Sequence, residues 1–206
     1  MKQAKIINKY YQTLKDYIPE NAVDDVMGLL VKNPISVKIT RERLTKQGDF
    51  RILKNGQAQI SVNHNLNPYQ FLLTFIHEMA HWLTYIKFKR DKPHGQEWKQ
   101  EFKYLMLPFL NESIFPIELL PYLAKYLINP KAATSSDVQL SIALKKYDVP
   151  SSSISLYELE LGNHFILRDK VFVLGDKRRT RYECLEKRTK KKYLIHQNAE
   201  VQRLDK

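Results

Sequence analysis

A long, mostly apolar segment, PYQFLLTFIHEMAHWLTYIKF at residues 68–88, constrains the fold more than any other part of this chain. Asn67 and Pro68 at its start are typical of a helix beginning, with asparagine as the N-cap and proline in the first turn. Apolar side chains occupy nearly every face of the helix, and such a helix is buried on most sides. We therefore predict a buried helix around which the rest of the chain packs.

Three polar residues interrupt this helix, namely His77, Glu78 and His81. Their spacing places both imidazoles on one face, about one turn apart, where both can bind one zinc ion. Glu78 projects about 100° around the helix, so its carboxylate can reach a metal-bound water without being a ligand. This is the His-Glu-x-x-His pattern of metallopeptidases. The alternative is two histidines bonded to backbone carbonyls, with Glu78 in an ion pair.

A catalytic zinc ion usually has three protein ligands and one water. We predict His94 as the third ligand, because the turn after the helix can return the chain to the metal. Gly95 beside it allows the backbone to approach closely. Glu97 is the alternative, either as the third ligand or as an acceptor for an imidazole N–H.

The segments before the apolar helix predict a small α+β unit. Apolar residues at helical spacing over 2–31 predict two helices separated by Pro19. Alternating residues predict strands over 34–43 and 55–63, with a turn at 46–50, and hence a small antiparallel sheet. The strand at 56–63 is either an edge that binds an extended substrate or an ordinary covered strand.

Composition restricts the choice of metal site and location. Cys184 is the single cysteine, which excludes an intrachain disulfide and an all-cysteine zinc site. No stretch reaches the roughly 18 consecutive apolar residues of a membrane span, and the first residues lack a signal-peptide pattern. We therefore expect a cytoplasmic protein with no membrane partner.

Positive charge is concentrated at the C-terminal end. The net charge is +12, and residues 163–206 contain 13 Lys and Arg against 6 Asp and Glu. Such an excess indicates either a polyanionic partner or a solvated surface. The two basic runs at 177–181 and 187–192 are predicted to form adjacent strands with one basic face. The candidate nucleic-acid contacts are Lys177, Arg178, Arg179, Arg181, Lys187, Arg188, Lys190, Lys191 and Lys192.

HEMAH at 77–81 followed by HGQEW at 94–98 resembles the SprT family of zinc metalloproteases, which includes the Spartan proteases. The resemblance implies a zincin-like domain with N-terminal helices, a small antiparallel sheet and a buried active-site helix. It implies zinc ligands at His77, His81 and His94, with Glu78 as catalytic base. The tail at 177–201 resembles the β-rich module of bacterial members, commonly a zinc ribbon with two cysteine pairs. Those cysteines are missing here, so no second, structural zinc is expected.

We predict a protease domain at 1–146, a linker at 147–160 and a basic β-rich module at 161–206. The expected function is a zinc endopeptidase with one catalytic ion and a protein substrate. The resemblance implies a substrate associated with or crosslinked to DNA, because Spartan proteases act on such proteins. One alternative is a zinc peptidase of general protein turnover. The other is a non-enzymatic DNA-binding protein with a vestigial metal site, against which Glu78 argues, since a structural metal needs no free carboxylate.

Overall fold

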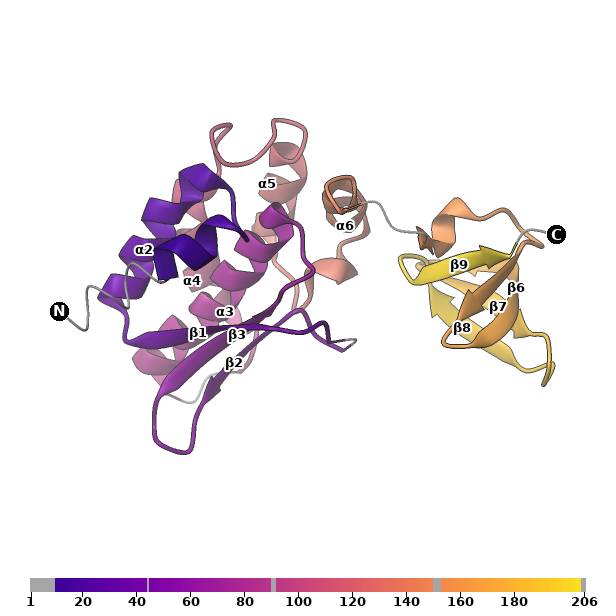
Figure 1. The fold of residues 1–206 in the computed structure, drawn as a ribbon, viewed down its shortest axis with the longest axis horizontal. Coiled ribbons are helices and arrows are strands. Elements are labelled where there is room, and N and C mark those ends of the chain that lie inside the picture. The colour runs from indigo at the N-terminus through magenta and orange to yellow at the C-terminus, as the bar shows by residue number, and fades with distance from the viewer. Residues whose placement is uncertain (1–9, 44, 90–91, 150–152, 205–206) are drawn as a thin grey trace. The chain divides into compact units, whose positions relative to one another are not determined.

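The computed structural model describes residues 10–43, 45–89, 92–149 and 153–204. The chain has an α+β fold and divides into two compact units, Met1–Asp148 and Val149–Lys206 (Figure 1). Among the described residues, no helix combines the length and the apolar character that crossing a membrane requires.

Helices open the first unit, as the sequence predicts. Residues 10–15 are helical, and Pro19 separates them from the 3-10 helix η1 (Glu20–Ala22) and from α2 (Val23–Lys32). Residues 1–9 of the predicted first helix lie outside the described residues. The apolar faces of these helices enter the core through Leu14, Ile18, Val23 and Val26.

A three-stranded sheet follows, in the order β1-β3-β2, formed by Ile35–Thr40 (β1), Gly48–Ile52 (β2) and Ala58–Asn63 (β3). β3 is parallel to β1 and antiparallel to β2. The prediction of an antiparallel sheet is therefore wrong at β1, and the prediction of a turn at 46–50 is wrong because β2 begins within it. The chain passes from β1 to the opposite edge and returns through the β2–β3 hairpin, so β1 and β3 point the same way.

Helix α3 (Pro68–Phe88) lies against this sheet, where it contacts β2 and β3 (Figure 1). The predicted N-cap is confirmed, because the Asn67 side chain accepts a hydrogen bond from the Gln70 N–H at 3.0 Å. The amide of Asn67 also donates to the Leu144 carbonyl at 2.9 Å, which ties the helix start to a later helix. The predicted burial is confirmed as well, since an unbroken run from Phe71 to Ala80 is buried.

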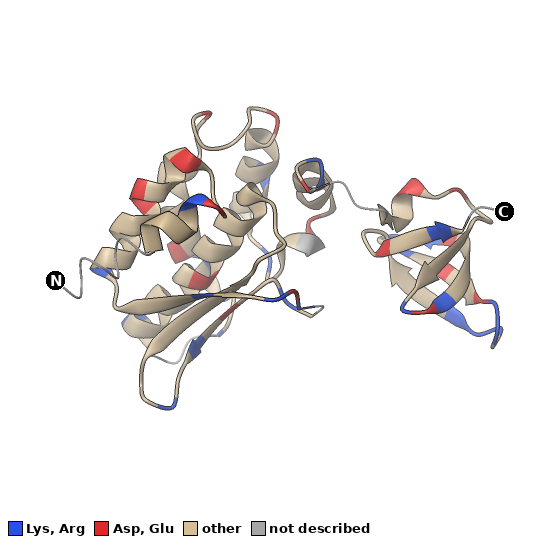
Figure 2. Ribbon diagram, in the orientation of Figure 1, with Lys and Arg blue, Asp and Glu red and all other residues tan. Residues whose placement is uncertain are grey.

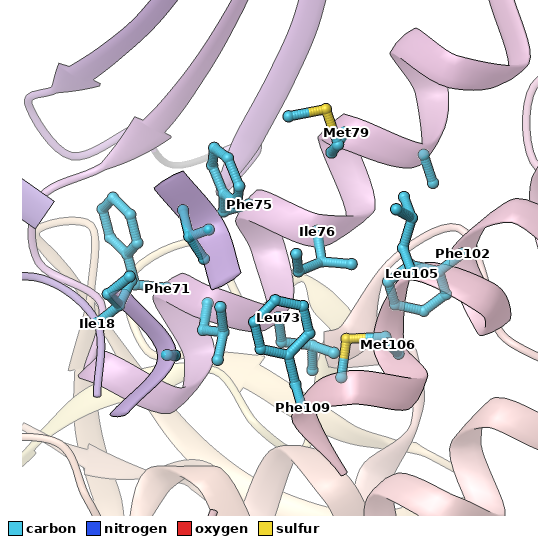
Figure 3. Close-up of a cluster of buried hydrophobic side chains, with 14 of the residues drawn as sticks. Ile18, Phe71, Leu73, Phe75, Ile76, Met79, Phe102, Leu105, Met106 and Phe109 are labelled. Carbon is cyan, nitrogen blue, oxygen red and sulfur yellow. The ribbon is translucent and has the colours of Figure 1, made fainter. Parts of the chain in front are cut away.

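Three further helices complete the first unit: α4 (Gln96–Met106), α5 (Leu120–Ile128) and α6 (Val138–Lys145). Figure 3 shows how the side chains of α3 meet those of α4 in the core; the labelled residues include Phe75, Ile76, Met79, Phe102, Leu105 and Met106. Full burial of one such side chain contributes roughly 1.5–3 kcal/mol to stability. This packing holds the histidine-bearing part of α3 in place.

The second unit is a six-stranded sheet in the order β4-β9-β5-β6-β7-β8. Its strands are Ile154–Ser155 (β4), His164–Leu167 (β5), Lys170–Arg178 (β6), Arg181–Glu186 (β7), Lys192–His196 (β8) and Glu200–Leu204 (β9). The predicted linker at 147–160 extends too far, because β4 pairs with β9 and Leu156 is fully buried in the core of this unit.

Candidate metal centre and catalytic site

Three histidine side chains of the first unit converge. The Nε2–Nε2 distances are 3.2 Å for His77–His81, 3.1 Å for His77–His94 and 3.0 Å for His81–His94. Helical spacing on α3 aligns the first two. A turn before α4 brings in the third, where the Gly95 N–H donates to the Lys92 carbonyl at 2.7 Å and His94 has a left-handed φ of 61°.

These nitrogens are spaced as one metal ion requires. Ligand atoms about 2.0–2.1 Å from a tetrahedral zinc ion lie roughly 3.3 Å from one another, close to the observed separations. Imidazole nitrogens suit zinc and other transition metals, whereas magnesium and calcium prefer oxygen. In the described part of the chain, these histidines are the one group of three or more potential ligands, and Glu97 is not in it. The geometry thus favours His94 over Glu97 as the third ligand.

The indole ring of Trp98, in α4, packs against all three histidine rings. Its ring centroid lies 4.6 Å from that of His77, 5.3 Å from that of His81 and 4.7 Å from that of His94. The side chain is fully buried, and its Nε1–H donates to the His77 carbonyl at 3.4 Å. Trp98 therefore helps to position the three imidazoles. Sequence reasoning did not assign it to the site, although it ends the HGQEW motif.

The surroundings keep the three imidazoles neutral. Burial, together with repulsion from the other two rings, holds the pKa of His77 well below its usual 6.5. Burial and the neighbouring His94 lower the pKa of His81 to about 4, and burial lowers that of His94. Neutral imidazole is the form that binds a metal. The site can therefore accept a cation at neutral pH without first releasing protons from these rings.

Glu78 projects from α3 toward β2, and its side chain is buried. Burial raises the pKa of this carboxyl to about 8, and the negative charge of Asp49 adds to the effect. A hydrogen bond from the Phe50 backbone N–H and the charges of Arg43 and Lys46 act in the opposite direction. A divalent cation at the histidines would also lower this pKa. With its pKa near neutral pH, the carboxyl of Glu78 can both accept and release a proton.

β2 touches α3 at Gly48. A Cβ atom at this position would lie 2.5 Å from Glu78 Oε1 and 2.7 Å from Thr74 Cγ2, so only glycine fits without displacement. Sequence reasoning missed this residue because it assigned 46–50 to a turn. The available signal was the alternation of apolar Phe50 and Ile52 with charged Asp49 and Arg51 after the glycine.

The outer edge of β2 is the free edge next to Glu78. β3 is the central strand, so of the two alternatives for 56–63 the covered strand is confirmed and the edge that binds substrate is excluded. The Gln47 carbonyl accepts a hydrogen bond from the Asn63 N–H, and the Leu53 N–H donates to the Gln57 carbonyl. The odd-numbered residues from 47 to 53 therefore direct their backbone groups toward the β3 side. Because antiparallel strands alternate in this way, the outward-facing backbone groups are those of Gly48, Phe50 and Ile52. The hydrogen bond from the Phe50 N–H to Glu78 agrees with this orientation.

Arg43 and Asn63 fix the segment that leads into β2. Arg43 Nε donates to Asn63 Oδ1 at 2.8 Å, and its Nη1 donates to Ser61 Oγ at 3.0 Å. The buried Asn63 amide donates in turn to the Lys46 carbonyl at 3.0 Å. These bonds hold the chain just before Gly48 and so determine where β2 meets Glu78.

A model of the SprT-like family matches residues 8–110, which is half of the chain and includes the sheet, α3, α4 and all three histidines. The chain belongs to the SprT-like family. Family membership suggests a metallopeptidase-like domain. Comparisons with curated proteins and with solved structures gave no significant match.

The basic runs of this SprT-like protein span the two turns at the ends of β7 and the strand residues that flank them. Residues 177–181 lead from β6 into β7, and 187–192 lead from β7 into β8. The prediction of adjacent strands with one basic face is confirmed in part, because Arg178, Arg181 and Lys192 lie on the neighbouring strands β6, β7 and β8 and their register places them on the same face of the sheet. The other residues of the two runs that lie between the strands are in the turns at opposite ends of β7. Glu183 between them pairs with Arg178 at 3.2 Å and with Lys192 at 2.7 Å. Figure 2 shows the Lys and Arg residues of this unit.

The core of the second unit is apolar. Cys184 of β7 is fully buried and unpaired, and burial raises the pKa of its thiol to about 11, so it stays protonated. Phe165 and Phe172 stack at a centroid distance of 5.4 Å. Hydrogen bonds from Thr189 and Tyr193 to the buried Glu186 anchor the turn between β7 and β8. The resemblance to a zinc ribbon gains no support from this six-stranded arrangement.

Proposed function

We propose that this SprT-like protein is a zinc-dependent endopeptidase that hydrolyses peptide bonds with a metal-activated water. The observation that carries the proposal is the convergence of the three imidazoles at 3.0–3.2 Å, with Glu78 next to His77 in α3. A structural zinc ion is normally enclosed by four protein ligands. Among the described residues, no fourth ligand joins the three histidines.

The chain's residues divide the chemistry among them. Zinc, when bound, supplies a Lewis acid that polarises the substrate carbonyl and lowers the pKa of water to about 7. His77, His81 and His94 hold the ion as neutral donors. Glu78 accepts the proton of the attacking water and passes it to the leaving nitrogen. A carboxyl whose pKa is raised to about 8 before the cation lowers it again suits a group that must gain and lose a proton near neutral pH.

The substrate is proposed to pair with β2. An extended peptide can add to a free strand edge through backbone hydrogen bonds. The outward-facing groups of β2 include the Phe50 N–H, which reaches Glu78. A peptide held along this edge therefore passes beside the catalytic carboxyl.

We also propose that the substrates are proteins associated with or crosslinked to DNA. The support is the positive charge of the second unit, which its two basic turns display at opposite ends of β7. Lys and Arg contacts of this kind bind phosphates without regard to sequence and weaken with salt. The proposed contacts are Lys177, Arg178, Arg179, Arg181, Lys187, Arg188, Lys190, Lys191 and Lys192.

Substitutions at the site test the hydrolytic function. Glu78→Gln is expected to keep one zinc per chain and to lose metal-dependent hydrolysis of a peptide or casein substrate. His94→Ala is expected to lower bound zinc well below one per chain, whereas the control Glu97→Gln keeps it. Wild-type hydrolysis by Glu78→Gln would remove this residue from the mechanism. Unchanged zinc in His94→Ala would assign the ligand role elsewhere.

DNA binding is tested by measuring affinity across salt concentrations. Reversing one charge in each basic turn, with Arg179→Glu and Lys190→Glu, is expected to weaken binding and to flatten its salt dependence. The exposed Lys54 of the first unit provides the matched control, Lys54→Glu. Absence of binding at low salt would favour general protein turnover instead.

A further inference from the structure

An aromatic cluster extends the catalytic face of α3 and has no role in the mechanism above. Glu78, Trp82 and Tyr85 follow one another at helical spacing, so they share one face of the helix. Phe50 of β2 lies over that face, with its ring centroid 6.0 Å from that of Trp82 and 5.9 Å from that of Tyr85. The rings of Trp82 and Tyr85 stack at 6.2 Å. We call Phe50, Trp82 and Tyr85 the aromatic shelf.

The shelf is partly open to solvent. Phe50 and Trp82 are half-buried, and 42% of the Tyr85 surface is exposed. Ile52, two positions along β2 from Phe50, is 38% exposed and extends the apolar surface. Phe50 and its two partners thus present aromatic surface beside the site, whereas the opposite side of α3 is covered by the core.

The orientation of Phe50 in β2 connects the aromatic shelf to the edge along which the substrate peptide is proposed to bind. The side chain of Phe50 faces α3, while its backbone N–H reaches Glu78 at the free edge. In an antiparallel pair, directly opposed residues project their side chains to the same face of the sheet. A peptide residue paired opposite Phe50 would therefore direct its side chain onto the shelf. The contact with Glu78 places that residue next to the bond that is cleaved.

We propose that the aromatic shelf selects an aromatic or large aliphatic side chain at the substrate position opposite Phe50. This inference rests on the proposed peptidase function and defines its substrate class. Aromatic rings pack favourably on other rings in edge-to-face or offset geometry. A carboxylate at the same position would lose hydration without a partner on the shelf.

Peptide series test the proposal on the zinc-loaded protein of residues 1–206. Peptides identical except at one scanned position carry Phe, Leu, Ala, Lys or Asp, and kcat/KM is measured for each. At one position next to the cleaved bond, Phe is expected to exceed Asp by about tenfold or more. Tyr85→Ala is expected to reduce that ratio to within about threefold. Tyr104→Ala, which removes an aromatic ring with 72% exposure on α4, is the matched control and keeps the ratio.

The outcomes separate this inference from the proposed function. Hydrolysis without a preference, a preference for Lys over Phe, or a ratio unchanged in Tyr85→Ala would overturn the role of the shelf and leave the peptidase function intact. Absence of hydrolysis for every peptide would overturn the function itself. Binding of the same peptides to Glu78→Gln, measured by fluorescence anisotropy, then decides about the shelf. The shelf is supported if Glu78→Gln binds the Phe peptide more tightly than the Asp peptide and if adding Tyr85→Ala to this variant abolishes the difference. Equal binding of the Phe and Asp peptides to Glu78→Gln contradicts it.

Discussion

Replacing Glu78 by glutamine should stabilise the metal-free protein, and increasingly so as the pH rises. The pKa of this carboxyl is raised from 4.5 to about 8 in the folded state, chiefly by burial. Between these values the folded protein keeps a proton that the unfolded chain releases. A raised carboxyl pKa thus makes a contribution to stability that is fully present below about pH 4.5 and is lost as the pH rises toward 8. Glutamine keeps the shape of the side chain and never ionises.

The size of the effect follows from the pKa shift. Each pKa unit corresponds to about 1.4 kcal/mol. The free energy of unfolding of Glu78→Gln should therefore exceed that of the wild type by roughly 1 kcal/mol at pH 5 and by roughly 4 kcal/mol at pH 8. Effects of other groups, including the three histidines, are present in both proteins and cancel to a first approximation in the difference.

Urea unfolding of EDTA-treated protein, followed by circular dichroism at pH 5, 6.5 and 8, measures this difference. Glu112→Gln at an exposed position is the control and should stay within about 0.5 kcal/mol of the wild type at each pH. Saturating zinc should reduce the advantage of Glu78→Gln, because a cation favours the carboxylate. A difference that stays constant from pH 5 to pH 8 would refute the claim that folding desolvates Glu78.

Three further predictions concern the same site. Zinc affinity measured by competition with a chromophoric chelator should decline less between pH 7 and pH 5.5 than three imidazoles of ordinary pKa would require, because the pKa values of His77, His81 and His94 are all lowered. A decline as steep as three ordinary imidazoles give would contradict this. The stability of metal-free Glu78→Gln should fall as the pH drops below 6.5, since the unfolded chain then binds protons that the folded imidazoles do not. This variant is used because the carboxyl of Glu78 has the opposite pH dependence. A urea midpoint that is unchanged between pH 7 and pH 5 would contradict the prediction. Gly48→Ala should cost about 1–3 kcal/mol in urea unfolding and reduce hydrolysis while retaining zinc, because its Cβ would displace Glu78; wild-type behaviour would show that β2 adjusts freely.

Local patterns in the sequence were sufficient to predict the helix that carries the site. The Asn67 cap, the apolar run and the four-residue spacing of His77 and His81 depend on helical geometry alone, so they could be read without knowing what packs against them. The position of His94 beside the other two histidines could also be predicted, because His94 follows His81 by thirteen residues and one reversal of the chain returns it to them. Membership of the SprT-like family agrees with the motif that these residues form.

Tertiary structure decided what surrounds that motif. The parallel pairing of β1 with β3, the free edge of β2 and the contact of Gly48 with Glu78 depend on strands that are distant in sequence, and strand pairing leaves no local signal. Trp98 is an ordinary core residue on its own helix until packing brings it against three imidazoles. The sequence by itself determined the candidate metal ligands and Glu78, because the period of a helix sets the positions of His77, Glu78 and His81 and a short turn returns His94 to them. Only packing decided the pKa of Glu78 and the surface that a substrate meets, because burial and edge exposure arise when separate elements come together.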